Sequence, residues 1–102
     1  METKIALFRD KGIRKTLHKN EWWFVIDDVV GVLTDSADPP GYINDMRRRD
    51  AELSKGWGQI VTPLWIETEG EKQKIECVNT EGIFRIIQSI SSPKAEAVKR
   101  WL

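Results

Sequence analysis

Cysteine, net charge and long apolar runs are all scarce in this 102-residue sequence. The lone Cys77 cannot form an internal disulfide, which excludes a disulfide-stapled secreted module and suits a reducing compartment. No apolar segment is long enough to span a membrane, and the N-terminal part lacks the basic-then-apolar run of a signal peptide. We therefore expect a cytoplasmic protein without membrane contact.

An excess of charge of either sign is also absent, because 16 Lys and Arg balance 16 Asp and Glu. Domains that bind nucleic acid unaided usually carry a basic excess, so zero net charge counts against that function. The charge is nevertheless segregated along the chain. It is +4 over residues 1–19, −5 over 20–40, +1 over 41–66, −3 over 67–81 and +3 over 82–102. We expect a surface with distinct acidic and basic patches.

The composition is that of an ordinary globular domain, with 40% hydrophobic and 31% charged residues. A chain of this length can bury a core without disulfides or metal. We expect residues 1–102 to form a single domain.

The N-terminal segments predict a three-stranded antiparallel meander. Residues 4–9, 13–18 and 21–26 are short and rich in β-branched and aromatic residues. Gly12 and Asn20 are placed to take positive φ in the two turns. The third segment is apolar on both faces, which indicates a central strand.

A second antiparallel hairpin is predicted later in the chain. Residues 59–67 and 72–78 have strand character, and residues 69–71 form the turn between them. Pro63 makes the first of these an edge strand or a bulge.

Helical segments are predicted between the two sheet regions. Asp27 or Asp28 caps a short helix that ends near Thr34, and after a turn of about four residues Asp38 caps a second helix. Residues 39–40 are two prolines in its first turn, where a missing N–H costs nothing. This second helix is expected to point four side chains inward, from Tyr42, Ile43, Met46 and Leu53. The Gly-Trp-Gly sequence at residues 56–58 is interpreted as a loop.

The C-terminal part predicts two more helices. Asn79 caps the first, whose inward stripe is formed by Ile83, Phe84, Ile86, Ile87 and Ile90. Ser92 and Pro93 open the second. Because no helix-terminating residue follows Leu102, we expect the chain to be the N-terminal part of a longer protein. The predicted fold class is α+β, with a small antiparallel sheet packed against about four short helices.

Enzymatic chemistry has little support. His18 and Cys77 are the only soft metal ligands, and one such pair cannot complete a structural zinc site. Helix capping accounts for the aspartates of residues 27–38 more simply than a cation site does. We expect no catalytic residues, no metal and no cofactor.

The basic helix is the strongest functional signal. In a helix-turn-helix unit the second helix enters the major groove, and neighbouring basic residues hold phosphates. Asn44 is suited to adenine, and Arg47 and Arg48 to guanine or phosphate. Arg49 lies on another side of the helix. The alternative is a solvated helix face on which Asp45 and Arg49 form a surface pair.

Other residues extend these hypotheses. Lys55 is expected to contact the DNA backbone, and Lys11, Arg14 and Lys15 of the first hairpin to complete one basic face. Trp57, in its expected loop, would be hard to bury and is interpreted as part of a partner-binding surface.

Several phrases of the sequence, taken in order, resemble a known family. They are WWFVI running into DDVV at residues 22–30, a Tyr-Ile pair before the arginine-rich helix at 42–49, VNTEGIFR at 78–85, and SPKAE at 92–96 closing on KRW at 99–101. They resemble the BRO family N-terminal domain of phage and prophage antirepressors and of large DNA-virus BRO proteins. They are also similar to the N-terminal part of bacterial DNA-damage-inducible protein D.

The resemblance covers essentially the whole chain. It implies a bacterial or phage-encoded, non-enzymatic α+β module that binds DNA and precedes a variable C-terminal region. From the sequence we expect a regulatory domain that binds double-stranded DNA. The rival is a protein-interaction module that sequesters a repressor or repair factor without touching DNA, and a homodimer is compatible with either.

Overall fold

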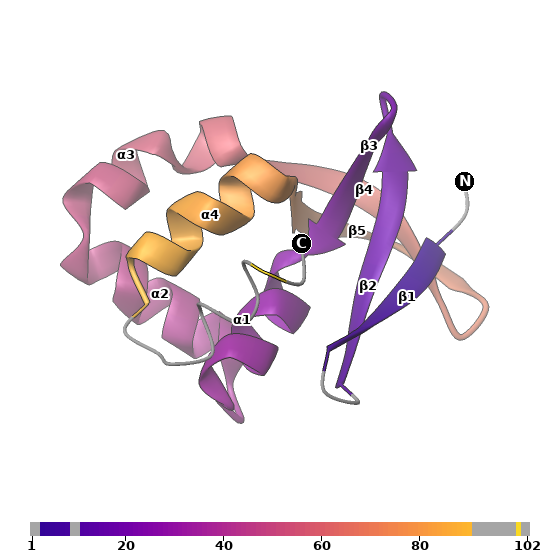
Figure 1. Cartoon of the computed structure of the whole chain (residues 1–102), viewed down its shortest axis with the longest axis horizontal. Helices are drawn as coiled ribbons and strands as arrows, with labels where there is room; N and C mark the ends of the chain where they lie inside the picture. Colours follow the sequence, from indigo (N-terminus) through magenta and orange to yellow (C-terminus); the bar gives the residue numbers. More distant parts are fainter. Residues whose placement is uncertain (1–2, 9–10, 91–99, 101–102) are drawn as a thin grey trace.

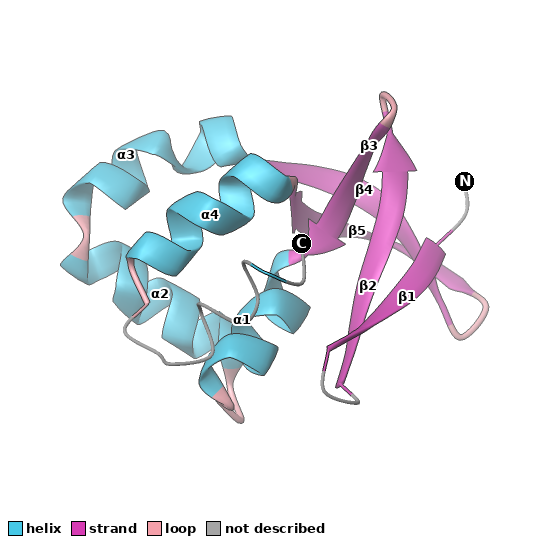
Figure 2. Ribbon diagram, in the orientation of Figure 1, coloured by secondary structure: helices cyan, strands magenta, loops and turns pink. Residues whose placement is uncertain are grey.

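The computed structural model describes residues 3–8, 11–90 and 100 as an antiparallel sheet with helices gathered on one side of it (Figures 1 and 2). The strands are β1 (Thr3–Phe8), β2 (Lys11–His18), β3 (Glu21–Val25), β4 (Val61–Thr68) and β5 (Glu71–Val78). The helices are α1 (Ile26–Thr34), α2 (Pro39–Arg49), α3 (Ala51–Ile60) and α4 (Thr80–Gln88). The predicted α+β class is confirmed. The predicted helix that opens at Ser92 lies outside the described residues.

The five strands follow the order β1-β2-β3-β5-β4, so β3 is central and β4 is an edge strand, as its proline at position 63 predicts. Asn20 takes φ 64° in the β2–β3 turn, together with Lys19 at 52°. The prediction for Gly12 is wrong: it lies within β2 opposite Leu7, outside the positive-φ region.

The sheet curls, which gives the molecule a second, smaller core. The main core lies between the helices and one face of the sheet, while Val25, Leu64, Ile66 and Cys77 form a separate cluster. The curl brings β4 toward β1, where the Glu67 backbone N–H donates to Thr3 Oγ1 at 2.9 Å.

The Cys77 thiol is expected to be inert. Its side chain is fully buried, and loss of hydration raises its pKa to about 11. Because only the thiolate is a nucleophile, the folded chain should not react with Ellman's reagent at pH 8. Unfolding in urea should release one reactive thiol per chain. Stoichiometric labelling of the folded chain within minutes would contradict this burial.

The start of α1 differs from the prediction. Neither Asp27 nor Asp28 caps it, because the N-cap residue is Val25 and no side chain accepts a hydrogen bond there. Asp28 instead binds Arg14 of β2 in a two-pronged ion pair, with Nε to Oδ2 at 2.8 Å and Nη2 to Oδ1 at 3.0 Å. A guanidinium with fork geometry competes successfully for this carboxylate, since charge-assisted bonds are the stronger ones.

Asp50 breaks the long second helix that the sequence predicts. Its backbone is extended, and its Oδ1 accepts the Leu53 N–H at 3.0 Å, which caps a new helix, α3. Its other oxygen accepts the hydroxyl of Ser89 at 2.6 Å and faces Arg85 at 3.4 Å, both on or beside α4. The side chains of Ile43, Met46 and Leu53 point into the core, as predicted. Tyr42, the fourth residue predicted to point inward, is half-buried.

The start of α4 agrees with the prediction, because Asn79 Oδ1 accepts the Gly82 N–H at 2.9 Å. Gly82 is required by close packing: a Cβ there would lie 3.0 Å from the Ile60 carbonyl oxygen. The four isoleucines of the predicted stripe are buried, but Phe84 is 38% exposed and was wrongly placed in the core.

Candidate nucleic-acid interface

Helix α2 begins as predicted and carries its cations at its C-terminal end. Asp38 accepts the Gly41 N–H at 3.2 Å, with prolines at the first two helical positions. Arg47, Arg48 and Arg49 fill the last turn, where the helix dipole favours positive charge.

One side of α2 combines an amide with two guanidinium groups. Ile43 and Met46 are buried, whereas Asn44 and Arg48, one turn apart, are exposed. Asn44, Arg47 and Arg48 line one open hollow together with Ser54 of α3. We call these four residues the α2 face. Lys55, the next residue along α3, is also exposed.

Arg49 lies elsewhere, as its helical position predicts. It borders a different depression with Tyr42 and Asp45, and Arg48 reaches both hollows. The predicted ion pair between Asp45 and Arg49 is wrong, because the Asp45 carboxylate pairs with Arg48, three residues away. Arg49 Nε instead donates to the Asp45 backbone carbonyl at 3.3 Å.

Trp57 is not in a loop, and its ring is not available as a free surface. Helix α3 continues through both glycines because Leu53, Trp57 and Ile60 repeat at helical spacing and face the core. The indole is 7% exposed, and the Arg47 guanidinium lies over its ring at 4.6 Å from the centroid. The expected exposed tryptophan is therefore corrected to a core residue covered by an arginine.

The basic residues of the first hairpin do not join the α2 face. Helix α1 contacts both α2 and β2 and lies between them (Figure 1). Lys11 pairs with Asp35, and the Lys15 ammonium lies 4.1 Å from the centroid of Trp22. Arg14 is held by its aspartate and also donates to a threonine hydroxyl of β4 at 3.2 Å.

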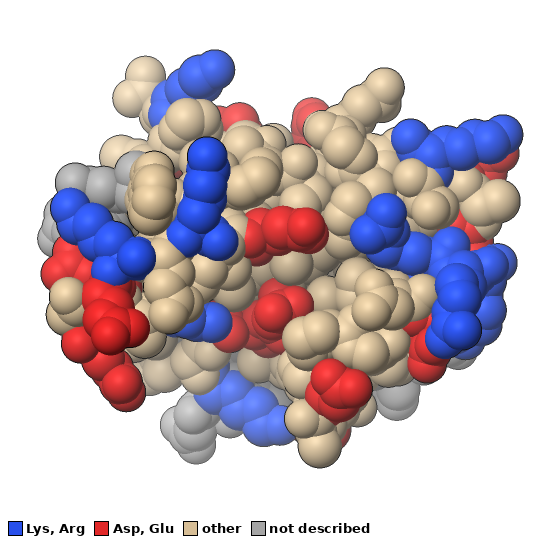
Figure 3. Space-filling model, turned by 180° about the vertical axis from the view of Figure 1, so that it is seen from behind, with Lys and Arg blue, Asp and Glu red and all other residues tan. Residues whose placement is uncertain are grey.

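The charge distribution agrees with this separation. Seen from behind, basic side chains gather over the end of the molecule formed by α2 and α3 (Figure 3). Acidic side chains separate them from the mixed charges over the strands (Figure 3). The segregation expected from the sequence is thus present on this surface, with one basic patch at the helical end.

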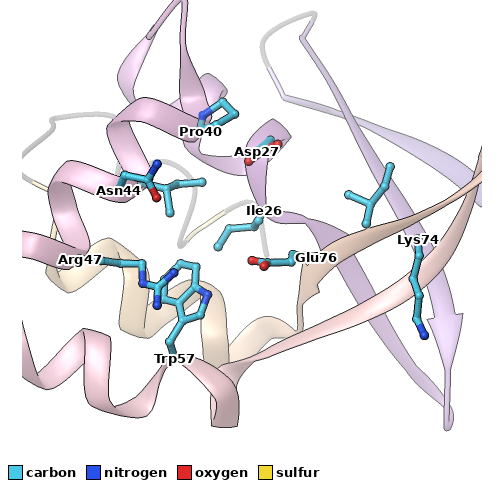
Figure 4. Close-up of a pocket in the computed structure, with 10 residues that line it drawn as sticks. Ile26, Asp27, Pro40, Asn44, Arg47, Trp57, Lys74 and Glu76 are labelled. Atoms are coloured by element: carbon cyan, nitrogen blue, oxygen red, sulfur yellow. The ribbon is translucent and has the colours of Figure 1, made fainter.

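An acidic hollow opens beside the α2 face, where four elements meet (Figure 4). Asp27 of α1 and Glu76 of β5 supply its two carboxylates, for which we call it the acidic hollow. Arg47, Trp57 and Lys74 also belong to its lining. Burial, followed by the charges of Asp28 and Glu76, raises the pKa of Asp27.

A comparison with known families matches residues 12–102 to the BRO family, N-terminal domain. The chain belongs to this family. No curated protein and no solved structure gives a significant match. The N-terminal domain of BRO proteins is generally considered DNA-binding, the family is non-catalytic, and its members are mostly phage and bacterial.

The described residues of this BRO domain contain no group of three or more His, Cys, Asp or Glu that could hold a metal ion. None of their helices is long and apolar enough to cross a membrane.

Sequence reasoning missed the acidic hollow of the BRO domain. It assigned Asp27 to helix capping and placed Glu76 in a strand without a role. The two residues lie far apart along the chain, and only the packing of α1 against β5 brings them together. No spacing in the sequence could have revealed the pair.

The Asp27→Asn variant is expected to be more stable than the wild type at pH 7. Because folding raises the pKa of Asp27, the folded state holds this proton more tightly than the unfolded chain, so the ionised carboxylate opposes folding above that pKa. The gain should shrink toward pH 3, where the carboxyl is protonated in both states. Thermal unfolding followed by circular dichroism at both pH values measures this. Glu71→Gln is a control on an exposed carboxylate, and a lower melting temperature for Asp27→Asn at pH 7 would contradict the expectation.

Proposed function

We propose that this BRO domain binds double-stranded DNA through the α2 face, as the regulatory domain of a bacterial or phage-encoded prophage-type antirepressor acting in the cytoplasm. The observation that carries the proposal is the grouping of Asn44, Arg47 and Arg48 around one open hollow. An amide suited to a base edge thereby lies beside guanidinium groups suited to phosphate or guanine. Family membership supports the same conclusion.

The helices have the relative order of a helix-turn-helix unit, with four residues, 35–38, linking α1 to α2. In such units the second helix enters the major groove. The cations here sit at the C-terminal end of α2, so we assign the contact to its second half and to the start of α3. Asn44 and Arg48 would reach base edges or nearby phosphates, and Arg49 and Lys55 would hold the backbone on either side.

The hairpin cations differ in how readily they could assist. The pairs made by Lys11 and Lys15 are exposed or partly exposed, and such contacts are weak enough to exchange for a phosphate. The Arg14 guanidinium donates hydrogen bonds to both carboxylate oxygens of Asp28, so we assign Arg14 a structural role before any role in DNA contact.

Capture of a repressor or repair factor is the second candidate. Exposed apolar side chains favour it, since Ile5 and Leu7 of β1 are 64% and 62% exposed. Edge strands with apolar side chains are natural docking sites for another chain, including a second copy of this one. The acidic hollow beside the α2 face also suits a protein better than it suits DNA.

Titration of a fluorescently labelled mixed-sequence duplex with the protein, followed by anisotropy, tests the DNA proposal. Arg48→Ala should weaken binding at low salt across all sequences and make the salt slope shallower by about one unit per lost phosphate contact. Lys72→Ala, which removes an exposed cation from β5, is the control for net charge and should have little effect. Equal losses in both variants would contradict a specific role for the α2 face.

A further inference from the structure

Two features of the acidic hollow beside the α2 face indicate a requirement for a ligand. The first is a missing hydrogen-bond acceptor: Trp57 Nε1 is buried and has no acceptor among the described residues. Figure 4 shows the Nε1 edge of this indole and the Glu76 carboxylate turned toward each other across the hollow. Buried polar groups are almost always hydrogen-bonded, so a missing acceptor is evidence for a group that is supplied from outside.

The second requirement is positive charge. Asp27 and Glu76 form no ion pair with any other described residue, although both line the hollow. The two cationic residues of its lining lie against aromatic rings instead: the Arg47 guanidinium covers Trp57, and the Lys74 ammonium lies 5.9 Å from the ring centroid of Trp65. The raised pKa of Asp27 has the same cause, a partly buried carboxylate next to other carboxylates.

We propose that the acidic hollow binds an arginine or lysine residue of a protein partner. The cationic head would lie on Asp27 and Glu76, and a main-chain carbonyl of the same segment would accept the Trp57 N–H. This inference goes beyond DNA binding, because it assigns a second ligand to a site that adjoins the α2 face.

The lining excludes other cations as better occupants. Two carboxylates are too few to hold a metal ion well, and no larger group of ligands occurs among the described residues. Three isoleucines from α1, α2 and β5, at positions 26, 43 and 75, add apolar walls that match the aliphatic stem of a basic side chain. A simple polyamine would satisfy the carboxylates but offers no acceptor to the indole.

The Trp57 indole resonance in a ¹H–¹⁵N correlation spectrum gives a direct readout. The Trp57→Phe variant identifies this resonance by removing it. Titration with Nα-acetyl-arginine methylamide should shift it saturably, whereas the citrulline analogue, equal in shape and uncharged, should not. A similar shift with citrulline would overturn the proposal.

Variants separate the site from the fold. Asp27→Asn combined with Glu76→Gln should weaken binding of the arginine compound about tenfold or more, as expected for the loss of charged hydrogen-bond acceptors. Glu69→Gln combined with Glu71→Gln makes the same charge change in the β4–β5 turn and at the first residue of β5, and it should leave binding unchanged. Equal affinity in both double variants would contradict the site.

Two further arms define the ligand and its independence from DNA. Free arginine should bind no more tightly than the capped compound, and clearly tighter binding would overturn the protein-partner assignment in favour of a free amino acid. Arg48→Ala should bind the arginine compound like the wild type even if it loses DNA. The Asp27→Asn, Glu76→Gln double variant should keep its affinity for duplex, so failure of either proposal is visible on its own.

Discussion

Replacing Arg14 with alanine is expected to lower the free energy of unfolding by about 2–4 kcal/mol, because it leaves a largely buried Asp28 carboxylate without its counter-charge. Three hydrogen bonds join the two residues, and one of them, from the Arg14 backbone N–H, survives the substitution. Out of a total stability of about 5–15 kcal/mol for a domain of this kind, the loss is large.

Urea denaturation of the Arg14→Ala variant measures this effect. Arg48→Ala is the matched control, since it also removes an arginine from an ion pair, but one that is exposed and worth about 0–1 kcal/mol. Arg14→Lys keeps the charge without the fork and should fall between wild type and alanine. Equal destabilisation by Arg14→Ala and Arg48→Ala would show that the bridge between β2 and α1 contributes little.

The Arg47→Ala, Arg48→Ala double variant is expected to lose duplex binding by about 10- to 100-fold at low salt, since two guanidinium contacts are removed together. The fold should survive, because the contact of Arg47 with Trp57 is worth only about 0.5–2 kcal/mol. A melting curve confirms folding before the anisotropy titration. Retention of full affinity by a folded double variant would rule out the α2 face.

The Arg48→Ala variant distinguishes the two candidate functions, because Arg48 belongs to the α2 face and does not line the acidic hollow. If the domain acts by capturing a repressor or repair factor, this substitution should leave that capture intact. Trp57→Ala is unsuitable as the reciprocal variant, because removing a buried tryptophan costs about 3–5 kcal/mol and would damage every function. Asp27→Asn with Glu76→Gln takes its place, since these side chains lie at the surface of the hollow.

The elements of this fold were predictable where the local pattern decides the outcome. Short segments rich in β-branched and aromatic residues predicted the strands. Apolar residues on both faces of β3 predicted its central place, and Pro63 predicted the edge place of β4. The side chains of Asp38 and Asn79 cap their helices as predicted because each reaches a backbone N–H three residues ahead.

The sequence-based prediction was wrong where a residue far away along the chain determines the local structure. Asp28 caps nothing because Arg14, on another element, takes its carboxylate. Asp50 divides a helix that periodicity alone would continue, and its carboxylate also contacts Arg85 of α4 and Ser89 just after that helix. The glycines beside Trp57 suggest a loop, but burial of a large indole outweighs their low helix propensity, which costs about 1 kcal/mol each.

The candidate site shows the same division. Helical spacing correctly separated Arg49 from Arg47, because that geometry is local. Whether the hairpin cations join the helix cations depends on α1, which packs between them, and on the aspartates that neutralise Lys11 and Arg14. Net charge could not reveal this, since it is zero for any arrangement of the same residues.

Duplex affinity measured as a function of salt tests the central claim most directly. If the α2 face grips the backbone with its neighbouring cations, the logarithm of the association constant should fall against the logarithm of salt concentration with a slope of about −3 to −5, as for about four to six phosphate contacts. A flat salt dependence, or no binding to any duplex at low salt, would contradict DNA binding by this domain.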